Sequence, residues 1–257
     1  MVTELSLWAV ESRTTFNPSK SVEVCAGPHP SDSDLVLNSA VIPRHAKTKH
    51  LGVVISSDLR WKDHLTSALS SVAPHVTLCL RLAYRHRLPA AVIRKFYVTF
   101  IRPRLEYCSA VWCGASSTLL KRLEKLQLRV ARAMVNQASG GSHCSSLLQQ
   151  VDLPTKAWRR REHCLLLLWK LLHGQGPPQL ASSLPLPASS RSARTLRSGH
   201  TLEFPSSQHR LRLTTLLCFV IPFWNVLPAS VVSGSRVASF RTALREFFSA
   251  DKFSFGL

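Results

Sequence analysis

The pattern of apolar and polar positions changes near residue 60. Before that point, apolar residues occur in short runs rich in Val, Ile and Leu, at 21–26, 34–42 and 51–56. Turn-forming Gly, Pro, Ser and Asp separate these runs, which predicts short strands. After residue 60, apolar residues recur at helical spacing. The pattern therefore predicts a mainly α fold with a short β-containing N-terminal segment, followed by a helical bundle and an α-rich C-terminal module.

The helical spacing predicts five helices. Pro74 lies inside the first and is expected to kink or break it. Pro103 is expected to end the second, because the residue before a proline avoids the α region. Gly140–Gly141 and Gly174 are expected to end the third and fourth. The predicted helices are 61–84, 89–102, 117–138, 155–173 and 236–248.

Composition divides the chain into three predicted regions. Residues 1–59 form the β-containing segment, residues 60–150 a basic helical domain, and residues 151–257 a helical C-terminal module. Residues 175–200 of that module are rich in Pro, Ser and Gly, which predicts an irregular loop. Residues 211–220 are expected to form a strand or loop.

The helix predicted at 117–138 is strongly amphipathic. Its apolar residues are spaced by 4, 3, 4 and 4 positions and cover about 80° of the helical wheel. They are Leu119, Leu123, Leu126, Val130 and Met134. The opposite side carries Lys121, Lys125, Arg129 and Arg132. The helix therefore combines one apolar face with one cationic face.

Charge is concentrated in the predicted helical regions. The chain of 257 residues has 33 Lys and Arg against 14 Asp and Glu, a formal net charge of +19. Residues 1–59 carry −1, so the whole excess lies after residue 59. Arginine accounts for 23 of the basic residues, and its planar guanidinium suits phosphate. A nucleic acid is therefore the favoured partner, ahead of an anionic membrane.

Membrane insertion and secretion are not expected. No apolar run approaches the roughly 20 residues that a spanning helix needs. Glu4 and Glu11 lie where a signal peptide would carry positive charge and an apolar run. Seven cysteines at irregular spacing indicate small buried thiols rather than a disulfide framework or a zinc site. The predicted location is intracellular, in nucleus or cytoplasm.

The sequence predicts no catalytic centre, metal site or cofactor. Two-metal polymerases and nucleases need neighbouring carboxylates, and the chain has six aspartates. Of these, Asp32 and Asp34 lie in a Ser-rich turn that favours side-chain capping over metal binding. Nucleotide-binding, hydrolase and zinc-deaminase motifs are absent from the sequence.

Two further basic clusters accompany the cationic helix face. Arg94, Lys95, Arg102 and Arg104 form one, and Arg159, Arg160 and Arg161 form the other. The latter three lie in the first turn of a predicted helix, where the helix dipole disfavours cations unless an anion lies nearby. Ordinary solvated faces are the alternative interpretation. Three clusters with few acids favour binding to a phosphate backbone.

Several strings together resemble the C-terminal part of the reverse transcriptases of non-LTR (LINE-type) retrotransposons, in the CR1, Jockey and RTE-like groups. No single string is diagnostic, but they run in the order of that family. They are FNPSKS at 16–21, HLGVVIS at 50–56, IRPRLEYC at 101–108, LEKLQ at 123–127, RRR at 159–161 and PFWNVLP at 222–228.

The resemblance implies the end of a palm, a thumb and a C-terminal region. Residues 1–59 would be the palm edge, with Leu51, Gly52 and Val53 in a primer-grip-like position. The helices after residue 59 would be the thumb, which holds RNA or an RNA–DNA template–primer by its backbone.

The catalytic Phe/Tyr-Ala-Asp-Asp motif of that family should precede the string at 16–21 and is not in the chain. The expected function is thus that of a truncated, non-catalytic fragment of an RNA-directed DNA polymerase, whose parent protein would supply the fingers and the rest of the palm. Two alternatives stay open: a host-used basic protein that binds acidic protein partners, and a translated relic without function.

Overall fold

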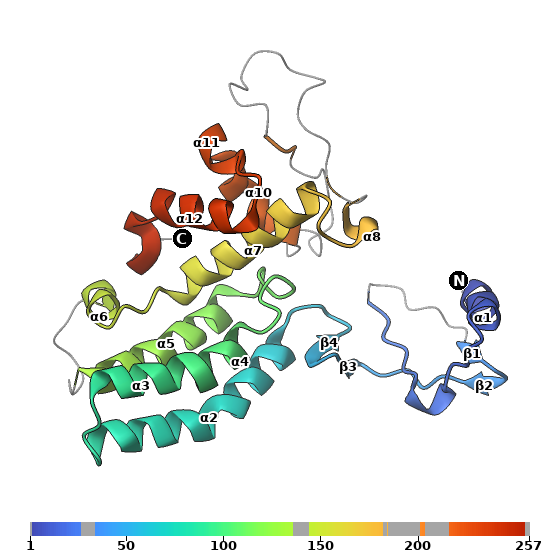
Figure 1. Ribbon diagram of the computed structural model, residues 1–257. Helices are drawn as coiled ribbons and strands as arrows, with labels where there is room; N and C mark the ends of the chain where they lie inside the picture. Colours follow the sequence, from blue (N-terminus) through green and yellow to red (C-terminus); the bar gives the residue numbers. More distant parts are fainter. Residues whose placement is uncertain are drawn as a thin grey trace. The chain divides into compact units, whose positions relative to one another are not determined.

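The structure is a computed structural model that describes residues 2–26, 34–135, 144–181, 184, 201–203 and 216–254. It is mainly helical with two small two-stranded sheets near the N-terminus, which confirms the predicted fold class (Figure 1). The chain divides into two compact units, Met1–Ser67 and Ala68–Leu257. The three-region division expected from composition stays a prediction.

The first unit contains a helix and two β-hairpins. Helix α1 (Val2–Glu11), which the apolar pattern did not predict, precedes the 3-10 turn η1 (Pro18–Lys20). Strands β1 (Val36–Leu37) and β2 (Ala40–Val41) pair antiparallel, as do β3 (Lys47–His50) and β4 (Val53–Ser56).

The tight turns of these hairpins need positive φ angles. Asn38 and Ser39 adopt φ of 49° and 64° in the first turn, and Leu51 and Gly52 adopt 44° and 83° in the second. The strand expected at 21–26 reduces to one isolated bridge between Glu23 and Arg44.

Helix α2 (Lys62–Tyr84) is continuous through Pro74. The second predicted helix is interrupted differently from the prediction: α3 (Ala90–Phe96) leads into the π-helical turn η2 (Tyr97–Ile101) and then α4 (Arg102–Glu106). The expectation that Pro103 ends the helix was therefore wrong. The π turn places Pro103 in the first turn of α4, where its missing N–H costs no helical hydrogen bond.

Helices α5 (Ser117–Met134), α6 (Cys144–Gln150) and α7 (Lys156–Leu172) follow. The Thr155 hydroxyl accepts a hydrogen bond from the Trp158 N–H at 3.1 Å and caps α7, while Gly174 leaves the helix with φ of 66°. The end expected for α5 at Gly140–Gly141 lies outside the described residues.

The C-terminal part adds α8 (Pro178–Ala181), α10 (Leu216–Asn225), α11 (Ala229–Val232), α12 (Val237–Phe247) and η3 (Ala250–Phe253). Trp169, Trp224 and Phe240 are fully buried where α7, α10 and α12 meet (Figure 1). The expectation of a strand or loop at 211–220 was wrong for residues 216–220, because α10 begins there. A short run that is apolar on all sides does not distinguish a buried helix from a strand.

No described helix is both long and apolar enough to cross a membrane. Residues 185–200, most of the irregular loop expected at 175–200, lie outside the described residues.

Candidate nucleic-acid interface

Residues of α2 and α5 line a basic surface cavity of about 410 Å³, here called the arginine pocket. Arg81, Arg85 and Arg129 supply its charges, and the side chains around it include no carboxylate. Tyr84 adds an aromatic ring that is 47% exposed. Thr77 and Leu80 complete the lining. The pocket thus joins an unneutralised positive charge to a flat apolar surface.

Local structure explains why these side chains gather. Arg81 and Arg85 are four residues apart at the end of α2, and the Arg85 N–H donates to the Arg81 carbonyl at 2.9 Å. That spacing places both side chains on one face of the helical turn. Within the described part of the chain, the guanidinium groups of Arg81, Arg85 and Arg129 make no hydrogen bond or ion pair. None of the described residues occupies the side-chain donors of these arginines, and such donors bind phosphate.

The exposed face of α5 extends this positive surface. Lys121, Lys125 and Arg129 are exposed as expected, and Arg132 is half-buried. Arg122 is also exposed and was not among the predicted residues. It lies about 100° from Lys121 on the helical wheel, within the same sector as Arg129, so the wheel could have revealed it. Arg81, Arg85 and Tyr84 were also missed, although the four-residue spacing of the arginines was visible.

The second predicted cluster does not form one surface. Arg94 donates to the Val151 carbonyl at 3.0 Å and to the Asp152 carboxylate at 2.8 Å, so it supports the loop after α6. Lys95 is exposed, and Arg104 contacts the His75 ring at 2.7 Å. Arg102 is half-buried and faces a different cavity.

The third predicted cluster lies within the packed protein. Arg159 forms a bidentate ion pair with Glu106: its Nε donates to Oε1 at 2.7 Å and its Nη2 contacts Oε2 at 2.7 Å. Arg161 pairs with Asp251 at 3.2 Å, and its guanidinium lies 4.3 Å from the centre of the Phe223 ring. Arg160 is 6% exposed. The anions that offset the helix dipole are thus the protein's own carboxylates.

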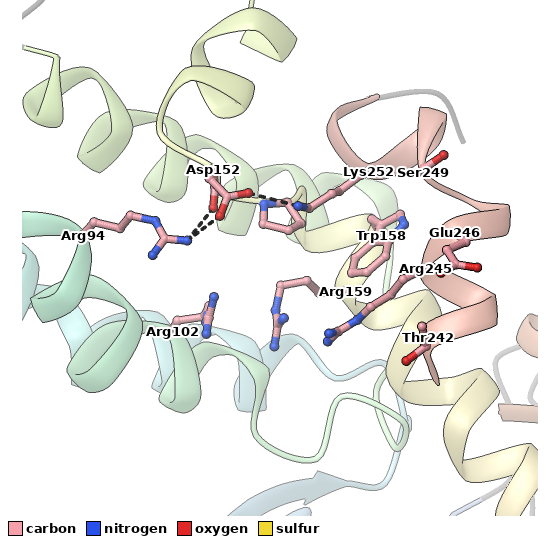
Figure 2. A pocket seen from close by; sticks show the side chains of 11 residues that line it. Arg94, Arg102, Asp152, Trp158, Arg159, Thr242, Arg245, Glu246, Ser249 and Lys252 are labelled. Atoms are coloured by element: carbon pink, nitrogen blue, oxygen red, sulfur yellow. Dashed lines mark hydrogen bonds and ion pairs between the residues drawn. The ribbon is translucent and has the colours of Figure 1, made fainter. Parts of the chain in front are cut away.

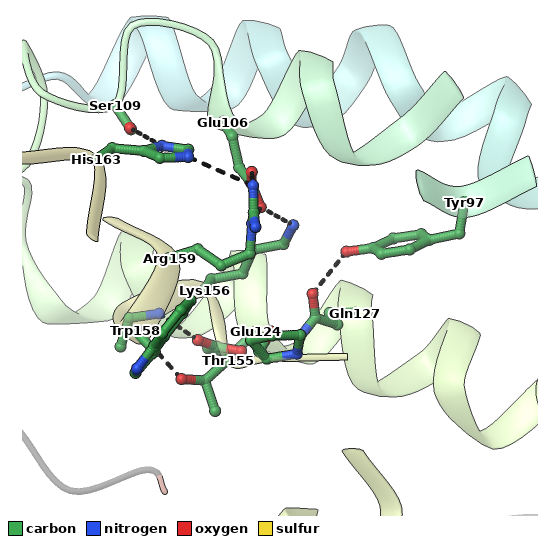
Figure 3. A network of polar contacts seen from close by, with 12 residues as sticks. Tyr97, Glu106, Ser109, Glu124, Gln127, Thr155, Lys156, Trp158, Arg159 and His163 are labelled. Atoms are coloured by element: carbon green, nitrogen blue, oxygen red, sulfur yellow. Dashed lines mark hydrogen bonds and ion pairs between the residues drawn. The ribbon is translucent and has the colours of Figure 1, made fainter. Parts of the chain in front are cut away.

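Glu106 is the centre of a buried polar network (Figure 3). It accepts from the Lys156 ammonium at 2.8 Å as well as from Arg159. Burial alone would raise the pKa of this carboxyl, but the charge of Lys156 and the hydrogen bond from Arg159 outweigh it and lower the pKa to about 2. Glu106 is therefore ionised, and it neutralises a lysine that is itself buried.

The same network joins strings that are far apart in the sequence. The Tyr97 hydroxyl donates to Gln127 at 2.8 Å, and Gln127 donates to the Pro154 carbonyl at 2.9 Å. Glu124 accepts from the Ala157 N–H at 2.9 Å. The strings at 101–108, 123–127 and 159–161 therefore meet in the core of the second unit, which gives them a structural role.

The residues expected in a primer-grip-like position lie at the turn between β3 and β4 and at the start of β4, in the first unit. Leu51 is 78% exposed at that turn, Gly52 has positive φ, and Val53 is buried at the start of β4. Among the described residues there is no group of three His, Cys, Asp or Glu that could hold a metal ion. The seven cysteines are free thiols.

Comparison with known proteins relates part of the chain to a polymerase. The chain is similar to the RNA-directed DNA polymerase from mobile element jockey of Drosophila funebris, with 27% identity over 134 residues. The match covers 49% of this chain and 14% of that polymerase. No family model matches, and no solved structure matches. The similarity supports a relation to the reverse transcriptases of non-LTR retrotransposons.

Proposed function

We propose that the chain is a non-catalytic, thumb-containing segment of a non-LTR reverse transcriptase that binds RNA or an RNA–DNA duplex by its phosphate backbone. The observation that carries the proposal is the arginine pocket, whose three guanidinium groups have no partner in the described part of the protein. Lys121, Arg122 and Lys125 continue the charge along α5. The relation to the jockey polymerase supports the same class of partner.

The chemistry of this surface favours contact with the backbone over reading of bases. Guanidinium groups bind phosphate oxygens in a bidentate geometry. Phosphate contacts position a protein on a duplex without specifying its sequence. The interface is therefore expected to recognise charge and helical form, and Tyr84 is available to stack on an unpaired base.

Filter binding to an RNA–DNA hybrid at a series of salt concentrations tests the proposal. Each phosphate contact adds about 0.9 to the slope of log K against log salt for a duplex. The triple variant Arg81→Gln/Arg85→Gln/Arg129→Gln should therefore reduce the slope by roughly 2.7. A matched control, Arg13→Gln/Lys20→Gln/Lys170→Gln, removes three exposed charges elsewhere and should leave the slope nearly unchanged.

The alternatives give different results in the same experiments. Equal effects of both triple variants, or no hybrid binding at low salt, would contradict the proposal. Saturable binding to polyglutamate without hybrid binding would favour a partner that is an acidic protein. A thermal melt without a cooperative transition would favour a relic that does not fold.

A further inference from the structure

A second cationic cavity lies in the helical unit, apart from the arginine pocket. It has a volume of about 620 Å³, which is within the range of small-molecule sites. Helices α3, α4, α7 and α12 and the turn η3 contribute to its wall (Figure 2). It is here called the Arg102 cavity. Its charged lining residues are Arg94, Arg102, Arg159, Arg245, Lys252, Asp152 and Glu246.

Four of these five cations already form an ion pair with a carboxylate. Arg94 and Lys252 share the Asp152 carboxylate, at 2.8 and 3.0 Å (Figure 2). The Arg245 Nε donates to Glu162 at 2.7 Å, and Arg159 donates to Glu106. Glu162 and Glu106 are not part of the cavity lining.

Arg102 differs from its neighbours. It is half-buried, and within the described residues its guanidinium makes no hydrogen bond or ion pair. Burial lowers the pKa of Arg102 and the charge of Arg159 lowers it further, while the charge of Glu106 offsets part of this effect. A half-buried cation beside another cation is unfavourable without an anion. The fold therefore holds a positive charge toward the cavity that makes no direct contact with a carboxylate among the described residues.

The chemistry of the wall points to one class of ligand. Five cations line the cavity together with the two carboxylates of Asp152 and Glu246, so the wall is positive overall. Guanidinium donors suit the several oxygens of a phosphate and can bind two of them at once. The hydroxyls of Thr242 and Ser249 and the Trp158 side chain complete the wall. The volume exceeds what one phosphate needs. We propose that the Arg102 cavity binds a phosphate-bearing anion of nucleotide size, with Arg102 as its central contact.

Isothermal titration of the full chain with inorganic pyrophosphate at low salt tests the site. The wild type should bind saturably, and Arg102→Gln should weaken binding at least about tenfold, as expected for the loss of a charged hydrogen bond. Arg102→Lys keeps the charge and should retain part of the affinity. Lys170→Gln removes an equal, exposed charge that lines neither cavity and should leave pyrophosphate binding unchanged.

Thermal melting separates a binding role from a structural one. Because the Arg102 guanidinium makes no hydrogen bond or ion pair among the described residues, Arg102→Gln should change the melting temperature little while it weakens binding. Absence of saturable pyrophosphate binding would overturn the proposal. Equal weakening by Arg102→Gln and Lys170→Gln would overturn it as well, because the effect would then be one of net charge.

Two sources could supply the phosphate, and oligonucleotides distinguish them. An RNA strand with a 5′-phosphate that competes with pyrophosphate, where the 5′-hydroxyl strand does not, would assign the cavity to a strand end. Pyrophosphate binding without such competition would assign it to a free nucleotide or polyphosphate. The site does not depend on the proposed duplex interface, whose failure would appear in the Arg81, Arg85 and Arg129 variants instead.

Discussion

Two sets of arginines in this protein have opposite roles. Arg159, Arg160 and Arg161 lie near the start of α7 and within the packing, where Glu106 and Asp251 neutralise two of them. The arginines of the pocket on α2 and α5 are exposed and have no internal partner in the described part of the chain. The sets are similar in residue type and number. The difference lies in where the carboxylates are placed.

This difference shows that a count of basic residues overestimates a binding surface. The chain has 14 acidic residues for 33 basic ones. Several acids are paired with the arginines that look most conspicuous in the sequence. The charge available to a partner therefore lies on less conspicuous residues, such as Arg81 and Arg85.

The largest expected effect is on the buried network. Glu106→Gln leaves the buried Lys156 ammonium without its carboxylate, which should reduce the free energy of unfolding by about 3–5 kcal/mol. Urea denaturation measures this loss. The matched control is Asp63→Asn, which removes an exposed ion pair with Lys47 and should cost less than about 1 kcal/mol. Similar losses in both variants would contradict the role given to Glu106.

Acid should weaken the same network. The pKa of Glu106 is about 2 in the folded protein against an ordinary value of 4.5, so its stabilising contribution is complete above pH 4.5 and is lost as the pH falls toward 2. The difference corresponds to about 3 kcal/mol. Denaturation curves measured across this range should show the loss of stability. In Glu106→Gln the share of the loss that comes from protonation of Glu106 should be absent. An unchanged pH dependence in the variant would exclude Glu106 as the cause.

Adjacent arginines of α7 should respond differently to one substitution. Arg159→Met removes charged hydrogen bonds to Glu106 and should cost about 2 kcal/mol of unfolding free energy. Arg160 is buried with an unpaired Nε, and burial lowers its pKa, so Arg160→Met should be neutral or stabilising. Thermal or urea unfolding of both variants checks this. Equal destabilisation would mean that the contact of the Arg160 guanidinium with the Phe219 ring, 5.4 Å from its centre, outweighs the cost of burial.

The smallest effect concerns single residues of the arginine pocket. Arg129→Gln should reduce the salt slope of hybrid binding by about 0.9 and leave the unfolding free energy nearly unchanged, because Arg129 has no partner in the described residues. Lys20→Gln, which removes an exposed charge in the first unit, serves as its control. A loss of stability in Arg129→Gln without a change of slope would place Arg129 with the structural arginines.

Much of the helical fold could be predicted from the sequence. The apolar spacing located α2, α5, α7 and α12, and the predicted ends differ from the described ends by a few residues at most. Thr155 and Gly174 marked both ends of α7. Pro103 and the start of α10 were misjudged. A π turn and burial on all sides depend on contacts that local pattern does not contain.

The candidate site could be predicted only in part. The cationic face of α5 follows from one helix and its wheel, so Lys121, Lys125 and Arg129 were found. The arginine pocket needs α2 beside α5, and the Arg102 cavity needs residues 150 positions apart. Three further expectations stay predictions: the primer-grip-like role of Leu51, Gly52 and Val53, the location in the cell, and the nucleic-acid partner.

The sequence by itself determined the excess of positive charge, the step in charge after residue 59 and the amphipathic helices, because these depend on composition and on the spacing of neighbouring residues. Only the tertiary structure decided which cations remain available. A guanidinium is neutralised when a carboxylate lies within about 4 Å, and the fold sets that distance between residues as far apart as Glu106 and Arg159. It pairs the arginines of α7 internally and leaves those of the arginine pocket and Arg102 unpaired among the described residues.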